Sequence, residues 1–429
     1  MSGGEAAEQY AHAPVPEGVT ISGWRVGLIV ASFSIGVPDF FNGATNALAL
    51  GMLPAIAVAV IAGLLLCVGG FLTSLVSIRS RLSTYLLTRR SFGIGGAAVI
   101  NLVVAFIHFC WFGVNATFVG EALQTATRAI GLEIPLPALI VLGGALMTAS
   151  TIFGFRALER LALIAVPVLA LVLLTVVVTS VSAYGIETAP SASAAPMPFG
   201  IALSAVIGAY MLAVATMPDL SRFISRPGGG AAAMAISFPV AMPLTMAAAA
   251  VPALATGQTS LMALVPMLGL GTPTLFLLLL PTWTLNAANL YSASLSLGTT
   301  FPRLRQWLVI VAGGVIGTLL ALGGILEAFV PFVLFLSVII PPIAAIYVID
   351  ALTRFRGVDA AASIADLPAV RWRAMFVWLG AAAIATLGAH AGWTVTQVPA
   401  LDATIAAALA YVLLQRRAKR DPGNGAEMG

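Results

Sequence analysis

The sequence has few charged residues: Asp, Glu, Lys and Arg make up only 8% of its 429 residues, against about 25% in an ordinary soluble domain. This scarcity excludes a water-facing surface around the whole molecule. The two cysteines, Cys67 and Cys110, both lie in apolar runs, so a disulfide framework is excluded as well. The HExxH, P-loop, GxSxG and CxxC spacings are missing and the histidines are scattered. A metal centre or a hydrolytic enzyme is therefore not expected.

Apolar residues are abundant instead, at 60% of the chain with a mean hydropathy of +1.04. Continuous apolar runs of about 18 residues or more predict α-helices that cross a lipid bilayer, because the strands of a membrane barrel would alternate in polarity. We expect an all-α polytopic membrane protein. Twelve membrane spans are predicted, at residues 26–49, 52–77, 95–125, 135–153, 160–183, 199–223, 232–256, 272–297, 305–326, 329–350, 372–390 and 399–415.

The basic residues indicate how these spans are oriented. With the N-terminus inside, all but one of the 20 Lys and Arg residues fall in inner loops and tails, the exception being Arg128. Basic residues concentrate in cytoplasmic loops, so we expect a bacterial inner-membrane protein with both termini cytoplasmic. Nucleic acid is then not needed to explain the basic charge. The N-terminal tail lacks the basic region and short apolar stretch of a cleaved signal peptide.

Spans one and six share a pattern that predicts interrupted helices. Span one contains Gly36 followed by Pro38, and span six contains Gly208 followed by Pro218. Proline removes a backbone donor, and many transporters bind their solute where broken helices recur in two halves of the fold. Freed backbone groups need partners, because lipid supplies none. We expect a solute and its coupling ion to bind there, with structural kinks as the alternative.

Asp39 lies near the middle of span one. A carboxyl group within a membrane is costly and is usually functional. It could exchange a proton, meet a cation or accept a hydrogen bond from a substrate. A carboxyl that only braces helix packing is the alternative.

Spans three and eight carry further candidate binding residues. Trp111, near the centre of span three, offers a flat face and an N–H donor, and His108 shares its side of the helix. In span eight, Asn286 and Asn289 are three residues apart and share a face, with Thr284 nearby. An amide both donates and accepts hydrogen bonds, which complements the polar edge of a heterocycle. Packing across helices is the alternative for each residue.

Five stretches resemble nucleobase:cation symporter family 1, and within it the bacterial cytosine permease branch. They are Leu82–Gly93, Trp111–Gly113, Pro218–Phe223, Trp283–Ser294 and Phe335–Asp350. The resemblance implies two inverted five-helix repeats plus two extra helices, as in leucine-transporter-type proteins. It also implies alternating access powered by a Na⁺ or H⁺ gradient. The expected division is an N-terminal tail (1–24), first repeat (25–184), second repeat (185–352), cytosolic loop (353–371), two extra helices (372–416) and C-terminal tail (417–429).

The resemblance also assigns roles to individual residues. It implies that Trp111 stacks on one face of the substrate ring and that Tyr210 covers the other. His108 stands where cytosine permease has glutamine. Asn286 and Asn289 match polar positions of the family motif in span eight.

The same motif departs from the family at Leu285, Ala287 and Ala288, and Leu285 replaces an expected sodium ligand. Thr284 and Gly36 are left as a possible part of a sodium site. Asp39 has no counterpart in the cytosine permease pattern, which raises proton coupling as a rival to sodium.

We therefore expect a secondary transporter, without cofactor or obligate protein partner, that imports a nucleobase such as cytosine or a related planar heterocycle. Hydantoin, allantoin and a thiamine-precursor pyrimidine are alternative substrates. A channel would need a continuous polar stripe, whereas the polar residues here gather near mid-span. A membrane-embedded enzyme would need a catalytic constellation that the sequence lacks.

Overall fold

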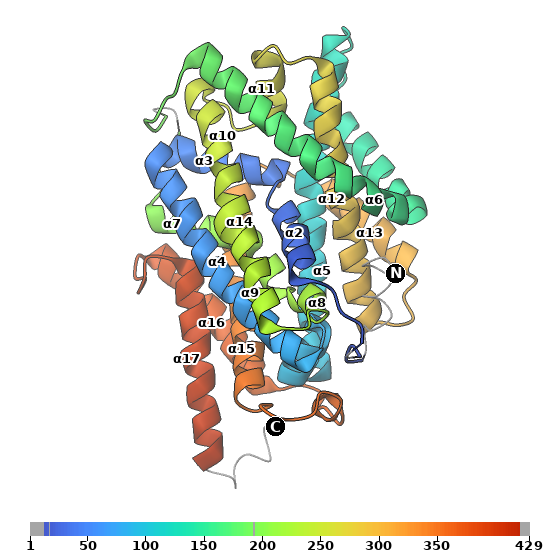
Figure 1. Cartoon of the computed structure of the whole chain (residues 1–429), viewed down its shortest axis with the longest axis vertical. Coiled ribbons are helices and arrows are strands. Elements are labelled where there is room, and N and C mark those ends of the chain that lie inside the picture. Colours follow the sequence, from blue (N-terminus) through green and yellow to red (C-terminus); the bar gives the residue numbers. More distant parts are fainter. Residues whose placement is uncertain (1–12, 17, 192–193, 421–429) are drawn as a thin grey trace.

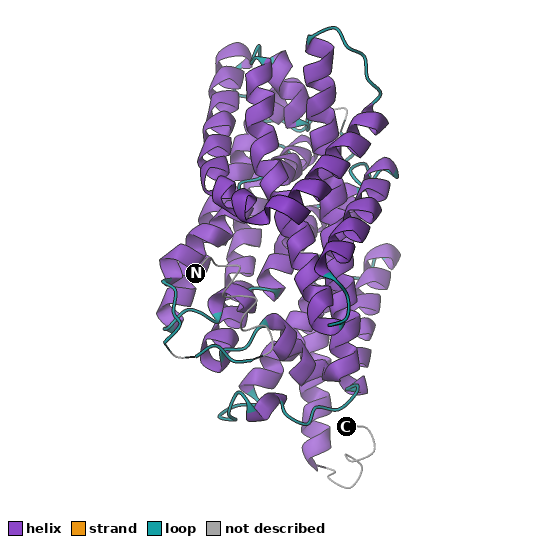
Figure 2. Cartoon of the chain, turned by 90° about the vertical axis from the view of Figure 1, so that its right-hand side faces the viewer, coloured by secondary structure: helices purple, strands orange, loops and turns teal. Residues whose placement is uncertain are grey.

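The computed structural model describes residues 13–16, 18–191 and 194–420, and within these ranges the chain forms helices and loops but no β-strand (Figures 1 and 2). Seven helical segments of the described residues are long and apolar enough to cross a bilayer, and two shorter apolar helices, Leu136–Ile152 and Gln306–Leu322, accompany them. The expected all-α membrane class is confirmed. The count of twelve spans remains a prediction.

Long helices dominate the first part of the chain. They are α2 (Gly23–Phe33), α3 (Val37–Leu50), α4 (Met52–Ser80), α5 (Thr84–Ala129) and α6 (Leu136–Tyr184). α5 begins where Ser83 accepts a hydrogen bond from the Leu86 N–H, as serine does at helix starts. It starts inside the predicted polar break and bends at Gly93, whose φ of +81° suits glycine.

α6 corrects the predicted break between spans four and five. Its 49 residues are continuously helical and contain Pro167, and the apolar segments Leu136–Ile152 and Pro167–Tyr184 lie on either side of the polar residues. Residues 155–163 read FRALERLAL, and Ala, Leu, Arg and Glu are strong helix formers. The polar break therefore continues the helix without forming a loop, and two arms of α6 diverge in Figure 1.

The remaining helices follow the predicted apolar segments closely. They are α7 (Phe199–Ala215), α8 (Pro218–Ser221), α9 (Pro227–Ile236), the π-helical turn η1 (Ser237–Ala241), α10 (Met242–Thr256), α11 (Leu261–Met267), α12 (Thr272–Thr300), α13 (Gln306–Leu322), α14 (Phe329–Ile339), α15 (Pro341–Leu352), the 3₁₀ turn η2 (Ala362–Ile364), α16 (Trp372–Ala391) and α17 (Pro399–Arg420). Span ten is thus divided into α14 and α15, where Pro341 and Pro342 remove two backbone donors.

Small residues let these helices approach closely, as is usual in membranes. A Cβ added at Gly208 of α7 would overlap the Val333 carbonyl oxygen of α14. On α13, Gly313 and Gly317 receive the rings of Phe109 and Phe112 from α5. α12 lies along both α5 and α6. Spans three, six, eight and ten, which carry most of the candidate site, are therefore held against one another.

Part of the predicted N-terminal tail is docked. The Val15 N–H donates to the Arg81 carbonyl (3.0 Å), and the Ile21 N–H donates to the Phe223 carbonyl (2.8 Å). Val15 is only 2% exposed, and α2 begins at Gly23, inside the range 1–24 expected to be tail. Residues 1–12 lie outside the described chain. Burying the apolar side chains of Val15 and Ile21 is energetically favourable, whereas a tail made only of polar residues would gain nothing from docking.

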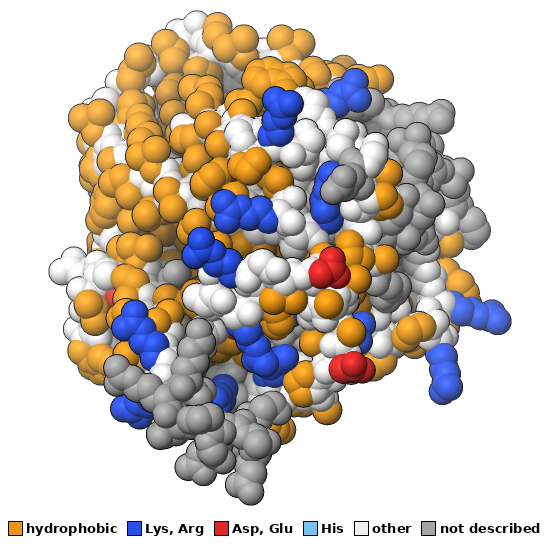
Figure 3. All heavy atoms as spheres, turned by 60° about the horizontal axis from the view of Figure 1, so that its bottom comes forward, with side chains coloured by type: hydrophobic (Ala, Val, Ile, Leu, Met, Phe, Trp, Pro, Cys, Tyr) orange, Lys and Arg blue, Asp and Glu red, His pale blue; other side chains and the backbone are white. Residues whose placement is uncertain are grey.

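The surface has one basic end. Figure 3 shows Lys and Arg side chains gathered on the end that carries the loop between α15 and α16, while the flank above it is apolar. Exposed apolar side chains such as Leu53, Phe376 and Leu387 cover the sides. This is the distribution expected of a protein surrounded by lipid with one positively charged face.

Candidate functional site

Span one is interrupted as predicted. α2 ends at Phe33, and α3 begins at Val37 with Gly36 at its N-cap. The Asp39 carboxyl turns back to accept from the backbone N–H of Gly36, which is one half of a capping box. A Cβ added at Gly36 would lie 2.6 Å from Asp39 Oδ2, so glycine leaves the room that this contact needs. One freed backbone donor is thus satisfied within the chain itself.

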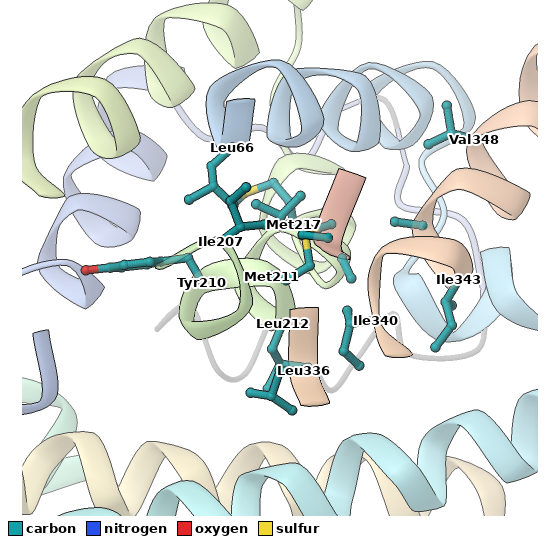
Figure 4. Close-up of a cluster of buried hydrophobic side chains, with 14 of the residues drawn as sticks. Leu66, Ile207, Tyr210, Met211, Leu212, Met217, Leu336, Ile340, Ile343 and Val348 are labelled. Atoms are coloured by element: carbon teal, nitrogen blue, oxygen red, sulfur yellow. The ribbon is translucent and has the colours of Figure 1, made fainter. Parts of the chain in front are cut away.

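Asp39 is paired with another of the predicted site residues. The Tyr210 hydroxyl donates to Asp39 Oδ1 at 2.5 Å, and the two side chains are 4% and 9% exposed. Figure 4 shows the Tyr210 ring projecting away from the cluster of apolar residues around Ile207 and Met211, with its hydroxyl at the far end. The bond links α3 to α7. Sequence reasoning named both residues but did not pair them.

A second polar pair links α5 to α12. His108 Nδ1 lies 3.2 Å from Asn289 Oδ1, and the tautomer in which Nδ1 carries the proton makes histidine the donor. The two residues come from the helices of spans three and eight, where the sequence placed them. Their direct contact depends on how two distant helices pack.

Asn286 is held within the helix packing. Its Nδ2 donates to the Phe112 carbonyl (3.2 Å) and lies 3.3 Å from Met147 Sδ. The residue is fully buried, and its Oδ1 has no hydrogen-bond partner among the described residues. A buried amide oxygen without a partner is unfavourable. Asn286 therefore braces α12 against α5 and keeps one acceptor unused.

Trp111 lies half-buried in an aromatic cluster. Its ring makes edge-to-face contacts with Phe329 (6.1 Å between centroids) and Phe332 (5.4 Å) of α14. Phe329 in turn meets Phe41 of α3 at 5.2 Å. Sequence reasoning missed these phenylalanines, although the spacing of three between Phe329 and Phe332 was a signal that both lie on one side of a helix. The cluster joins spans one, three and ten.

Thr284, one of the two residues proposed for sodium, uses its hydroxyl within its own helix. The Thr284 hydroxyl donates to the Pro281 carbonyl at 3.0 Å, within its own helix. Its oxygen lone pairs remain able to accept or to coordinate. The described residues contain no group of three or more His, Cys, Asp or Glu side chains placed to hold a metal ion.

Span six is interrupted as predicted, at its proline and not at its glycine. α7 runs unbroken through Gly208 and Tyr210 to Ala215, and the interruption falls at Thr216 and Met217. Gly208 serves the close approach of α14 described above and does not open the helix. The interruption predicted from Gly208 and Pro218 therefore lies beside the proline, whereas the glycine is required by helix packing.

The carbonyls freed at the end of span six are already bound. Thr73 of α4 donates to the Val214 carbonyl, Tyr347 of α15 to that of Ala215, and Ser77 of α4 to that of Pro218. The three distances are 3.0, 2.8 and 3.0 Å. Side chains of neighbouring helices thus satisfy the backbone carbonyls that were expected to bind a solute or an ion.

Comparison with known proteins gives one consistent result. A family model described as "Permease for cytosine/purines, uracil, thiamine, allantoin" matches residues 26–413. The cytosine permease of Escherichia coli strain K12 is 29% identical over 413 residues, which are 94% of each chain. The hydantoin permease of Microbacterium maritypicum is 25% identical over 307 residues, or 65% of this chain and 62% of that protein.

Two solved structures show the same fold. The inward-facing conformation of Mhp1 superposes with a TM-score of 0.85 over 95% of this chain and 93% of that chain, at 20% sequence identity. Mhp1, a nucleobase-cation-symport-1 family transporter, in a closed conformation with bromovinylhydantoin bound gives 0.77 over 96% of both chains, at 21% identity. The helical arrangement is therefore shared, while the internal repeat of this chain remains a prediction.

Proposed function

We propose that this chain, which belongs to the family of permeases for cytosine, purines, uracil, thiamine and allantoin, imports a nucleobase such as cytosine or a related planar heterocycle. It is a multi-pass membrane transporter. We place it in a bacterial inner membrane with both termini in the cytoplasm, and a Na⁺ or H⁺ gradient drives it by alternating access.

The observation that carries this proposal is the match to cytosine permease along 94% of both chains. The site residues support it. Trp111 provides a ring for stacking, which contributes about 0.5–1.5 kcal/mol beyond burial. Asn289 and His108 provide polar groups for the edge of the heterocycle, and a buried polar edge rejects analogues that leave its groups unpaired. We assign Tyr210 to the other ring face and Asn286 Oδ1 to a substrate donor.

Two candidate sites exist for the coupling ion. Gly36 and Thr284 would serve Na⁺, whereas Asp39 would carry H⁺. Leu285 supplies no side-chain oxygen where the family motif has threonine, and Asp39 is a buried carboxyl that links spans one and six through Tyr210. These features favour H⁺. A coupling ion that binds the same closed form as the substrate raises the affinity for it, and the effect is reciprocal.

A thermal-shift screen of the purified protein tests both substrate and ion. The panel holds cytosine, adenine, uracil, hydantoin and allantoin, each with and without Na⁺ and at two pH values. A true ligand at one hundred times its Kd stabilises the folded form by about 2.7 kcal/mol. Hydantoin is the second candidate, because a hydantoin permease aligns with 65% of this chain. A panel without any shift would contradict the proposal.

Replacing the stacking residue gives the matching prediction for transport. Trp111→Ala should abolish saturable uptake of the ligand found in the screen, because the ring loses its stacking partner. Trp372→Ala is the matched control, since Trp372 is 56% exposed at the start of α16 and should transport normally. Uptake of labelled substrate into cells, corrected for the amount of inserted protein, is the measurement. Normal uptake by Trp111→Ala would remove the stacking role.

A further inference from the structure

A buried carboxyl lies at the inner end of span ten, away from the candidate site. Asp350, near the end of α15, is fully buried. Gln415 of α17 donates to its Oδ1 at 2.7 Å, but Oδ2 has no hydrogen-bond partner among the described residues. A buried carboxylate with an unpaired oxygen is unfavourable. The hydroxyls of Ser91 and Tyr411 also act on this carboxyl, but Oδ2 has no charged partner among the described residues in this conformation.

A buried guanidinium whose donors lack hydrogen-bond partners lies close by. Arg90 of α5 is 2% exposed, and its Nε and Nη2 have no hydrogen-bond partner within the described chain. Its Cζ lies 4.4 Å from the ring centroid of Phe355, and the Phe355 N–H donates to the Asp350 carbonyl at 2.9 Å. The charge of Asp350 acts on Arg90. One ion pair would satisfy the unpaired atoms of both side chains.

Each charge is carried by a short helical segment that ends at an interruption of the helix. Arg90 lies between the start of α5 at Thr84 and the non-helical Gly93. Asp350 lies on α15, which a break at Ile340 separates from α14. Glycine at positive φ and a broken helix are places where a small change of dihedral angle turns a whole segment. The two segments are therefore able to move relative to each other.

We propose that Arg90 and Asp350 are positioning residues of the transport cycle, which meet in a buried ion pair at the inner ends of α5 and α15 in a second conformation and are parted in this one. Burying a charge without its partner is costly, and pairing offsets that cost. The pair stabilises the conformation in which the segments approach, and thereby sets the balance between the two states. This proposal rests on the protein being a transporter that changes conformation and not on the identity of its substrate.

Neighbouring charges provide the rival explanation. Arg354 and Arg371 also attract Asp350. Arg354 is exposed, and its Cζ lies 5.5 Å from the Phe355 ring. The backbone N–H of Arg371 is held by the Phe92 carbonyl at 2.8 Å. Arg354→Gln is therefore the matched control for Arg90→Gln, because it removes an arginine near the same carboxyl without touching the buried pair.

The test measures distances between two spin labels on purified protein in lipid nanodiscs, with Cys67 and Cys110 replaced. The labels are placed at Arg79→Cys, near the end of α4, and Arg356→Cys, in the turn after α15, both of which are exposed positions. We expect two distance populations. Arg90→Gln and Asp350→Asn should each reduce the share of the shorter one about tenfold relative to the longer one, a coupling within the usual range for contacting residues. Arg354→Gln should leave it unchanged.

The charge-reversed double variant completes the test. Arg90→Asp with Asp350→Arg should restore the shorter population, because the attraction is regained. A distribution that stays the same in Arg90→Gln and Asp350→Asn, or that changes only in Arg354→Gln, would overturn the proposal. The label distances need no substrate, so this outcome differs from a heterocycle screen without hits. Asp350→Asn nearly preserves the side-chain shape, and its elution as a single folded species shows that a lost population is not a loss of fold.

Discussion

At the scale of single residues, the hydrogen bond between Tyr210 and Asp39 joins α3 to α7 and pairs two side chains that we propose to take part in transport. A carboxyl within the membrane needs partners from the protein. Asp39 has the Tyr210 hydroxyl and the Gly36 N–H. Tyr210 belongs to α7, whereas Gly36 lies in the interruption before α3. Breaking the bond should therefore affect the stability of the fold as well as uptake.

Tyr210→Phe tests this bond. The variant keeps the ring but leaves the Asp39 oxygen without its donor, which should lower the free energy of unfolding by about 1–3 kcal/mol. Tyr184→Phe is the control, because Tyr184 is 49% exposed at the end of α6 and should unfold like the parent protein. Denaturant unfolding in detergent, followed by tryptophan fluorescence, gives the comparison. Equal stability of the two variants would show that the bond contributes little.

At the scale of helices, the contact between α7 and α14 depends on a missing side chain. Gly208 brings the backbone of α7 against the Val333 carbonyl of α14. Since α14 carries Phe329 and Phe332 onto Trp111, this packing also places the aromatic cluster. A larger residue at position 208 must push the two helices apart.

Gly208→Ala is expected to destabilise the protein by about 1–3 kcal/mol, the usual result of overpacking. Gly298→Ala provides the control, because nothing lies within 4 Å of a Cβ added there, and alanine favours a helix over glycine by about 1 kcal/mol. The measurement is the melting temperature of both variants under one set of conditions. If Gly208→Ala melts like Gly298→Ala, the close contact has no energetic role.

The same scale shows what sequence reasoning reached and where it failed. The break in span one was predictable, because Gly36 and Pro38 lie two residues apart and both disfavour a continuous helix. The capping residue Asp39 follows directly in sequence. The unbroken helix at Gly208 was not, since Val333 lies more than one hundred residues away in sequence. Nor were the partners of the span-six carbonyls, because Thr73 and Tyr347 come from other helices. The periodicity of one helix says which residues share a side, but not what they meet.

The candidate site, too, was predictable from the sequence only in part. Residue types and mid-span positions pointed to Trp111, His108 and Asn289 without any structure. The pairing of His108 with Asn289 and the enclosure of Asn286 required the packing of α5 against α12. Side-chain chemistry was therefore predictable where it depends on membrane depth, and not where it depends on the neighbouring helix.

At the scale of the whole molecule, the basic end seen in Figure 3 gives an orientation. Basic residues are retained on the cytoplasmic side, and the loop between α15 and α16 lies at that end. Arg128, at the opposite end of α5 from the basic loops, is then the one basic side chain on the outer face. We treat this orientation as a proposal.

Single cysteines at the two ends test the orientation in intact cells whose protein lacks Cys67 and Cys110. Arg128→Cys should react with a membrane-impermeant maleimide added outside, whereas Arg417→Cys should react only after the cells are opened. Both positions are exposed, so access to reagent and not burial decides the result. The reverse pattern would invert the proposed topology.

The docked segment before α2 has a practical consequence for anyone who alters the start of this protein. Because the backbone N–H groups of Val15 and Ile21 donate to the corners that follow α4 and α8, residues 13–16 and 18–22 link two bends of the chain. Affinity tags or fluorescent fusions are best joined ahead of residue 13, where this link stays intact. Trimming to the first apolar helix would release both corners at once.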